Sequence, residues 1–180
     1  MRIAFSGTHF SGKSSLIEAL SEEFPQYEVF DEPYWILSDL GHHFSDPPTI
    51  EEFQEQLECS INLIKQSSGN TLFDRSPIDF LGYALAIAEE HSEEFDHEKW
   101  VSQIEKPLSS LDLIVFLPIE NPDRIPLPYS EDKHLRLLVD EKLKELILED
   151  PYKIMNTEIL EVTGTLNQRI KKIKQRISNL

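Results

Sequence analysis

A glycine-rich stretch near the N-terminus carries the residues best suited to chemistry. It reads Gly-Thr-His-Phe-Ser-Gly-Lys-Ser over residues 7–14, after a short apolar run and before a helical pattern. This is the pattern GxxxxGK[ST] in its required position between a strand and a helix. Gly7 and Gly12 permit a turn that points backbone N–H groups inward, while Lys13 supplies a cation. The stretch therefore predicts a binding site for the β and γ phosphates of a nucleoside triphosphate.

The expected nucleotide-binding residues cover the whole loop and the start of the helix. The Ser14 hydroxyl is also a candidate ligand of Mg²⁺, which prefers oxygen donors. The predicted set is Gly7, Thr8, His9, Phe10, Ser11, Gly12, Lys13, Ser14 and Ser15.

Charged residues follow two further predicted strands, at residues 27–30 and 70–73. Asp31 and Glu32 come directly after the first strand, and Asp74 and Arg75 after the second. Ligands bind at the carboxyl ends of the strands in open α/β sheets, so these residues are expected close to the phosphate loop. A surface turn is the alternative for the first pair. Ser76, with the Pro and Asp that follow it, is explained by an ordinary helix start.

A proline-rich segment at residues 118–131 is predicted to be a mobile lid. It contains four prolines and Arg124, and Arg136 lies near the start of the next predicted helix. Phosphoryl transfer requires cations around the phosphates and a carboxylate for the attacking hydroxyl. A kinase must also exclude water, which favours kinase chemistry over hydrolysis when a lid is present. A regulatory NTPase that acts on a protein partner, and a binding module without turnover, are the alternatives.

The elements that position these residues follow an alternating order. Further strands are expected at 113–117 and 159–162, and residues 36–48 are expected to be a loop or frayed helix. Helices are predicted at 49–67, 77–90, 93–108 and 131–149, and a last one is capped by Thr165. The alternation predicts a five-stranded parallel sheet with helices on both faces.

Composition narrows the class of partner. The chain has 180 residues, a net charge of −16 and one cysteine, Cys59. The length predicts a single domain over residues 1–180. The negative charge argues against nucleic-acid and membrane binding. The lone cysteine and the absence of room for a signal peptide predict a cytoplasmic protein. The basic run at 169–176 is expected on the solvent face of an amphipathic helix.

With Asp74-Arg75-Ser76, the chain resembles the P-loop kinases of nucleosides and nucleoside monophosphates, in the thymidylate and deoxynucleoside kinase branch and their predicted ATPase/kinase relatives. The resemblance implies the P-loop NTPase fold with an arginine-bearing lid. It also implies ATP and Mg²⁺ as cofactors, with Asp74 near the metal. The lid here lacks a clear RxxR pair, and Asp79 lies one residue closer to its strand than the corresponding aspartate of deoxynucleoside kinases.

The resemblance also assigns the catalytic roles. Either Asp31 or Glu32 is implied as the base, Arg75 as a ligand of the substrate or its phosphoryl group, and Arg124 or Arg136 as the lid arginine. The expected catalytic set, with the loop lysine included, is Lys13, Asp31, Glu32, Arg75, Arg124 and Arg136. The implied function is ATP-dependent phosphoryl transfer to a small acceptor, a nucleoside or nucleotide. The acceptor is expected near Tyr34, Trp35, Phe80 and the histidines at 42 and 43. A homodimer through the helices between the second and fourth strands is implied by the related kinases.

Overall fold

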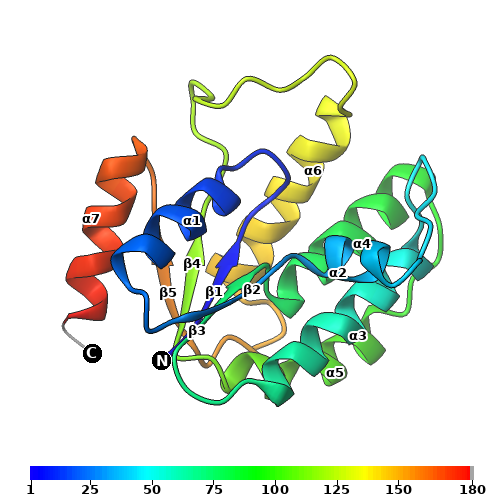
Figure 1. The fold of residues 1–180 in the computed structure, drawn as a ribbon. Coiled ribbons are helices and arrows are strands. Elements are labelled where there is room, and N and C mark those ends of the chain that lie inside the picture. Colours follow the sequence, from blue (N-terminus) through cyan, green and yellow to red (C-terminus); the bar gives the residue numbers. More distant parts are fainter. Residues whose placement is uncertain (179–180) are drawn as a thin grey trace.

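The computed structural model describes residues 1–178, in which five strands form an all-parallel sheet (Figure 1). The strand order is β2-β3-β1-β4-β5. The strands are β1 (Arg2–Ser6), β2 (Glu28–Phe30), β3 (Thr71–Asp74), β4 (Leu113–Phe116) and β5 (Glu158–Glu161). In the register, Phe5 of β1 lies between Asp74 of β3 and Val115 of β4. The carboxyl ends of the central strands are therefore level, as the sequence predicts.

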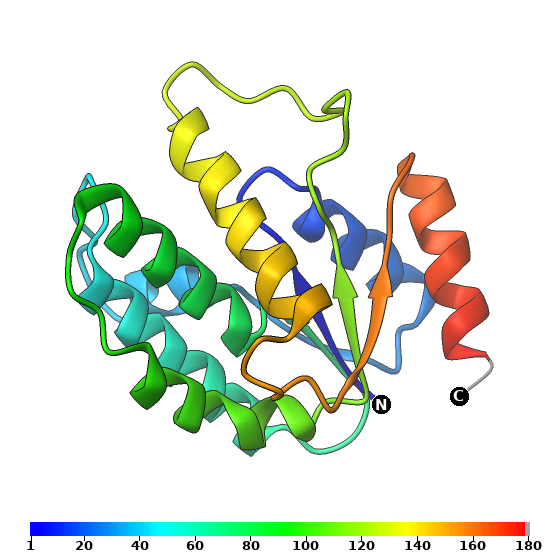
Figure 2. The ribbon, with the colours of Figure 1, turned by 180° about the vertical axis from the view of Figure 1, so that it is seen from behind.

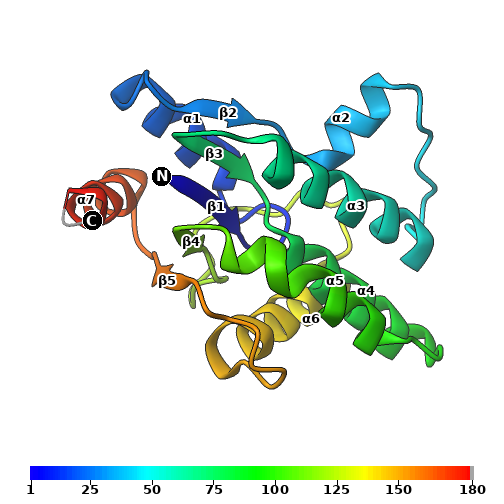
Figure 3. The same ribbon diagram turned by 90° about the horizontal axis from the view of Figure 1, so that it is seen from below.

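Helices cover both faces of this sheet, which confirms the predicted architecture. Viewed from below, α1 and α7 lie on one side, and α3, α4, α5 and α6 lie on the other (Figure 3). The helices are α1 (Lys13–Glu23), α2 (Pro33–Asp39), α3 (Ile50–Gln66), α4 (Pro77–His91), α5 (His97–Ser109), α6 (Lys133–Lys144) and α7 (Leu166–Ile177). A π-helical turn, η1 (Glu145–Glu149), extends α6.

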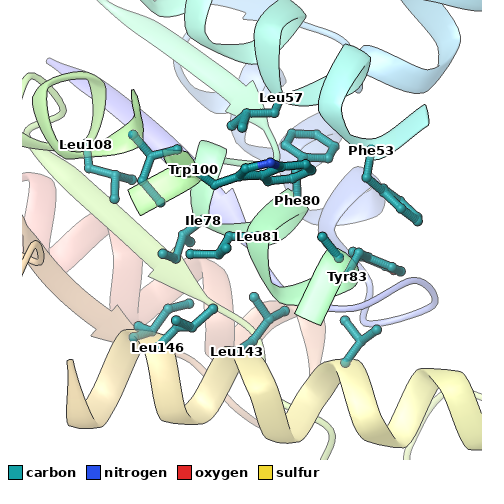
Figure 4. Packing of buried hydrophobic residues seen from close by; sticks show 14 of the residues in the cluster. Phe53, Leu57, Ile78, Phe80, Leu81, Tyr83, Trp100, Leu108, Leu143 and Leu146 are labelled. Carbon is teal, nitrogen blue, oxygen red and sulfur yellow. The ribbon is translucent and has the colours of Figure 1, made fainter. Parts of the chain in front are cut away.

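Alternation along the strands divides the apolar core into two layers. Ile3 and Phe5 of β1 pack with α1 and α7, whereas Ala4 faces the larger cluster beneath α3 to α6. In that larger cluster, Trp100 and Phe80 pack beside Leu57 (Figure 4). Gly82 brings α4 against α6, because a Cβ at this position would lie 2.7 Å from Leu143 Cδ2. The core thus fixes α4, whose N-terminus lies at the phosphate loop.

Several helices begin where the sequence indicates. Thr49 and Ser76 each form a capping box with an acidic residue three positions later, and Thr165 forms one with Gln168. These boxes satisfy backbone N–H groups that the first helical turn leaves without partners. α4 therefore starts two residues after Arg75, and Arg75 directly follows the end of β3.

One element differs from the prediction. Residues 33–39 form the short helix α2, so the segment expected as a loop or frayed helix over 36–48 is helical only at its start, and the helix begins three residues earlier. Glu32 is extended and Pro33 occupies the first helical position, where its fixed φ and missing N–H are tolerated. The proline thus starts a helix here.

The lid segment, residues 118–131, contains no helix or strand, as predicted. It connects β4 to α6 and runs above the carboxyl end of the sheet (Figure 2). Within residues 1–178, no helix combines the length and the apolar character needed to cross a bilayer. The last two residues of the predicted domain, 179–180, lie outside the described part of the chain.

Candidate active site

The phosphate loop leaves a run of backbone N–H groups available to a ligand. Within the described residues, the N–H groups of residues 10–14 donate to no other group. Gly12 has φ 88° and is the N-cap of α1. A Cβ on Gly7 would lie 2.6 Å from the carbonyl oxygen of Leu117. Free N–H groups at a helix N-terminus form an anion site, which agrees with the predicted phosphate binding.

Lys13 is buried with its ammonium group inside this loop. Its Nζ donates to the carbonyl oxygens of Gly7 at 3.0 Å and Thr8 at 2.9 Å. Burial first, and then the positive charge of Arg75, lowers the pKa of Lys13. Three donors on one flexible stem allow Lys13 to exchange these carbonyls for phosphate oxygens.

Two arginines hold the loop from its outer side. Arg136 donates to the carbonyl oxygens of His9 and Phe10, both at 3.0 Å, and Arg169 donates to that of Ser11 at 2.8 Å. Three consecutive carbonyl groups are thereby occupied. Arg136 was expected as a lid residue, yet it is buried against the loop and pairs with Asp123 at 2.5 Å.

Arg169 corrects one interpretation of the sequence. It was placed on the solvent face of the last helix, but its side chain is 7% exposed and also pairs with Glu120 at 2.9 Å. The same carboxylate accepts a hydrogen bond from Arg124 at 2.8 Å. Arg124 itself is 54% exposed, so this lid arginine lies at the surface above the loop.

Ser14 and Asp74 lie together at the inner end of the loop. Ser14 Oγ donates to Asp74 Oδ2 at 2.9 Å. The other carboxylate oxygen, Oδ1, is buried and has no hydrogen-bond partner among the described residues. Burial raises the pKa of Asp74, although Lys13 opposes the shift. An unpartnered carboxylate oxygen beside a hydroxyl fits a magnesium ion whose remaining ligands are phosphate and water oxygens.

Glu32 and Arg75 form a nearly buried ion pair beside the loop. Arg75 Nε lies 2.5 Å from Glu32 Oε1, and its Nη1 donates to Gly7 O at 3.1 Å. Burial opposes ionisation of Glu32, but the positive charges of Arg75 and Lys13 outweigh it and lower the pKa of Glu32. Asp31 is exposed and does not line the adjacent cavity. The structure thus brings Glu32, but not Asp31, to the phosphate loop.

The cavity next to this ion pair has a volume of about 500 Å³. Its lining comes from the loop, α2, α3, α4 and the end of the lid segment. Two aromatic pairs form part of its wall: Tyr34 stacks on Phe44 at 4.4 Å between ring centroids, and Phe53 stacks on Tyr83 at 4.8 Å. Flat apolar walls with a few polar groups are typical of small-molecule sites.

Only part of the expected acceptor wall is found there. Tyr34 lines the cavity, as expected, whereas Phe80 is fully buried in the core and Trp35 is 61% exposed. Neither His42 nor His43 belongs to the lining. Phe80 points inward because it belongs to the apolar stripe of α4 that packs into the core.

Asp79 and Tyr83 are site residues that sequence reasoning missed. Asp79 completes the predicted helix cap, and its Oδ1 also accepts the Gly7 N–H at 2.8 Å. The Tyr83 hydroxyl accepts the His9 N–H at 2.8 Å and contacts Arg75 Nη2 at 3.4 Å. Positions 79 and 83 of α4 are four apart, so one face of this helix meets the loop. This spacing, visible in the sequence, was the signal that could have identified both residues.

Comparisons with known proteins agree with this geometry. Residues 2–169 match the family described as AAA domain. No curated protein matches the chain. Among solved structures, the chain is similar to deoxyadenosine kinase from M. mycoides with products dCMP and a flexible dCDP bound, with a TM-score of 0.74, 16% identity and complete coverage of both chains.

Two further structures show the same likeness. Deoxyadenosine kinase from M. mycoides with bound dATP gives a TM-score of 0.70 at 16% identity, covering 99% of this chain and 100% of that one. Thymidylate kinase from Candida albicans gives a TM-score of 0.63 at 17% identity, covering 98% of this chain and 90% of that one. This likeness concerns the fold, which is the α/β fold of P-loop NTPases. Since the family match spans residues 2–169, the chain belongs to the AAA domain family.

Proposed function

We propose that this chain transfers the γ-phosphoryl group of ATP to a nucleoside or nucleotide. The observation that carries the proposal is the cavity of about 500 Å³ beside the phosphate loop, with Glu32 and Arg75 in its wall. A phosphate site alone would serve any NTPase. A second, aromatic-lined cavity at the same strand ends supplies a place for an organic acceptor.

The reaction assigns a task to each group. A hydroxyl or phosphate oxygen of the acceptor forms a bond to the γ phosphorus, while the bond to the β–γ bridging oxygen breaks and ADP leaves. Glu32 accepts the proton when the attacking group is a hydroxyl. Lys13 and the free N–H groups of the loop bind the transferred phosphate oxygens. Arg75 holds the Glu32 carboxylate in position.

Ser14 and Asp74 would hold Mg²⁺, which neutralises charge on the β and γ phosphates when bound. Among residues 1–178, no group of three His, Cys, Asp or Glu side chains is placed to hold a metal ion by itself. Phosphate oxygens would have to complete the magnesium site. We therefore expect metal binding to depend on the nucleotide.

The lid arginines receive different tasks in this proposal. Arg124 is exposed and bound only to Glu120 among the described residues, so a small rotation of the lid segment could bring it to the phosphates. Arg136 already contacts the loop through two carbonyl groups and is proposed to keep it in shape. We also propose a single domain, a cytoplasmic location and a homodimer through the helices between β2 and β4.

A coupled assay of ADP release tests the function. Purified protein is given ATP and Mg²⁺, with and without a panel of nucleosides and nucleoside monophosphates. Stimulation by an acceptor, together with a phosphorylated product detected by mass spectrometry, is the expected result. ATP hydrolysis that no acceptor changes would instead support the regulatory ATPase. Binding without turnover would contradict both enzyme functions.

A further inference from the structure

The wall of the acceptor cavity is predominantly acidic. Its described lining contains four carboxylates, Glu32, Asp46, Glu131 and Asp132, and Arg75 is its single permanent cation. Arg75 is already neutralised, because Glu32 lies at 2.5 Å and Asp79 Oδ1 at 3.7 Å. The remaining carboxylates are not balanced by a cation of the lining. The described lining therefore carries more negative than positive formal charge.

His9 adds a hydrogen-bond donor to this wall but no charge. The Tyr83 hydroxyl accepts the His9 N–H and contacts Arg75 Nη2, so its own hydrogen is available for His9 Nδ1 at 2.9 Å. This network assigns the imidazole proton to Nε2. Burial first, then the charge of Arg75, lowers the pKa of His9 to about 4. The imidazole is consequently neutral at physiological pH.

Arg124 of the lid segment and Arg136 of α6 do not line the cavity either. Both line a separate small gap together with Arg169. Arg136 is occupied by Asp123 and two loop carbonyls. An anion in the acceptor cavity would thus meet carboxylates without a free cation among the described lining residues.

On the basis of the proposed kinase function, we propose that the acceptor enters this cavity as an uncharged nucleoside and attacks through a hydroxyl group, and that nucleoside monophosphates are rejected. The phosphate of a monophosphate carries roughly two negative charges. In this cavity it would lie beside carboxylates and would lose hydration without new cationic partners. A hydroxyl can instead donate to Glu32. The pairs Tyr34–Phe44 and Phe53–Tyr83 supply the aromatic part of the lining, which suits the apolar faces of a base.

Matched substrates test this inference. Nucleosides and their own 5′-monophosphates are compared base by base at fixed ATP and Mg²⁺, so that only the phosphate differs. The expected kcat/KM is at least about tenfold higher for the nucleoside of the preferred pair, and the ratio should fall as salt is raised, because salt screens the carboxylates.

Variants of the wall sharpen the test. Glu131→Gln and Asp46→Asn should each raise kcat/KM for the monophosphate about threefold, since each removes one repelling charge. Glu141→Gln is the matched control, because Glu141 lies exposed on α6 outside the lining. This substitution should leave kcat/KM unchanged for both the nucleoside and the monophosphate. Phosphorylation of monophosphates in preference to nucleosides would overturn this inference while supporting the kinase. Stimulation by neither class would overturn both proposals.

Discussion

Removing the charge of Glu32 tests the centre of the proposed mechanism. In Glu32→Gln the side-chain oxygen can still accept a hydrogen bond from Arg75 Nε. The hydrogen bond is therefore kept, and only its charged character is lost. Hydrogen bonds to charged groups contribute about 1.5–3 kcal/mol and neutral ones about 0.5–1.5 kcal/mol, which leaves a loss of about 1–2 kcal/mol. For a chain of this length, the melting temperature should fall by about 2–8 °C.

The same substitution should reduce turnover far more than it reduces stability. Loss of a general base typically lowers kcat by about 10²- to 10⁴-fold, whereas ATP binding involves the phosphate loop and should stay within about threefold. Acceptor-dependent ADP release measures the first quantity, and the thermal shift caused by ATP measures the second. Asp31→Asn is the matched control because Asp31 is exposed. Normal turnover in Glu32→Gln together with loss of turnover in Asp31→Asn would refute the assignment.

The pH dependence provides an independent check on the ion pair. The folded-state pKa of Glu32 lies below its ordinary value of 4.5. A lowered carboxylate pKa contributes stability that is fully present above about pH 4.5 and is lost as the pH falls through the folded-state pKa. The stability difference between wild type and Glu32→Gln, measured by urea unfolding, should therefore be constant above pH 5 and shrink below 4.5. A difference that does not change down to pH 3 would contradict the proposed charge interaction.

Three further outcomes are expected. Lys13→Ala should abolish the ATP-dependent rise in melting temperature, which would be about 5–11 °C at 100 times Kd in wild type. Arg169→Ala should destabilise the protein by about 1.5–3 kcal/mol in urea unfolding, because the Ser11 carbonyl loses its charged donor and Glu120 keeps only Arg124 and the Gly164 N–H. Lys172→Ala, an exposed control, should change stability by less than about 0.5 kcal/mol. The kcat/KM profile should show no inflection from His9 near pH 6.5, since the pKa of His9 is about 4, and an inflection lost in His9→Phe would contradict that value.

The phosphate loop and the strand order were predictable because their signals are local. A glycine turn between a strand and a helix has few structural alternatives, and apolar runs separated by capped helices lead to a parallel sheet. The position of Asp74 follows from the same reasoning, since β1 and β3 are neighbours and end at the same level. From the sequence, Asp31 and Glu32 were equal candidates for the catalytic base. Pro33 starts a helix directly after them, and only Glu32 lines the cavity.

The acceptor cavity could not be derived in this way because its wall has no local motif. Its aromatic pairs join α2 to the following loop and α3 to α4, and each contact depends on how far the helices pack from one another. Phe80 and Tyr83 belong to one helix and differ by three residues, yet Phe80 is buried in the core and Tyr83 reaches His9. Helical periodicity shows which side of α4 is apolar, but it does not show where along that side the core ends and the cavity begins.

Arg169 shows a second limit of periodicity. The apolar stripe of the last helix passes through Ile170 and Ile173, and Arg169 is four residues before Ile173, at the flank of that stripe. A position at the flank of a stripe faces solvent when its side chain is short, but an arginine can extend over neighbouring surface and place its charged end elsewhere. Here it reaches the Ser11 carbonyl of the phosphate loop, 158 residues earlier in the chain. The loop motif alone therefore specifies the N–H groups that face a phosphate, whereas the groups that hold the carbonyls of residues 9–11 come from distant α6 and α7.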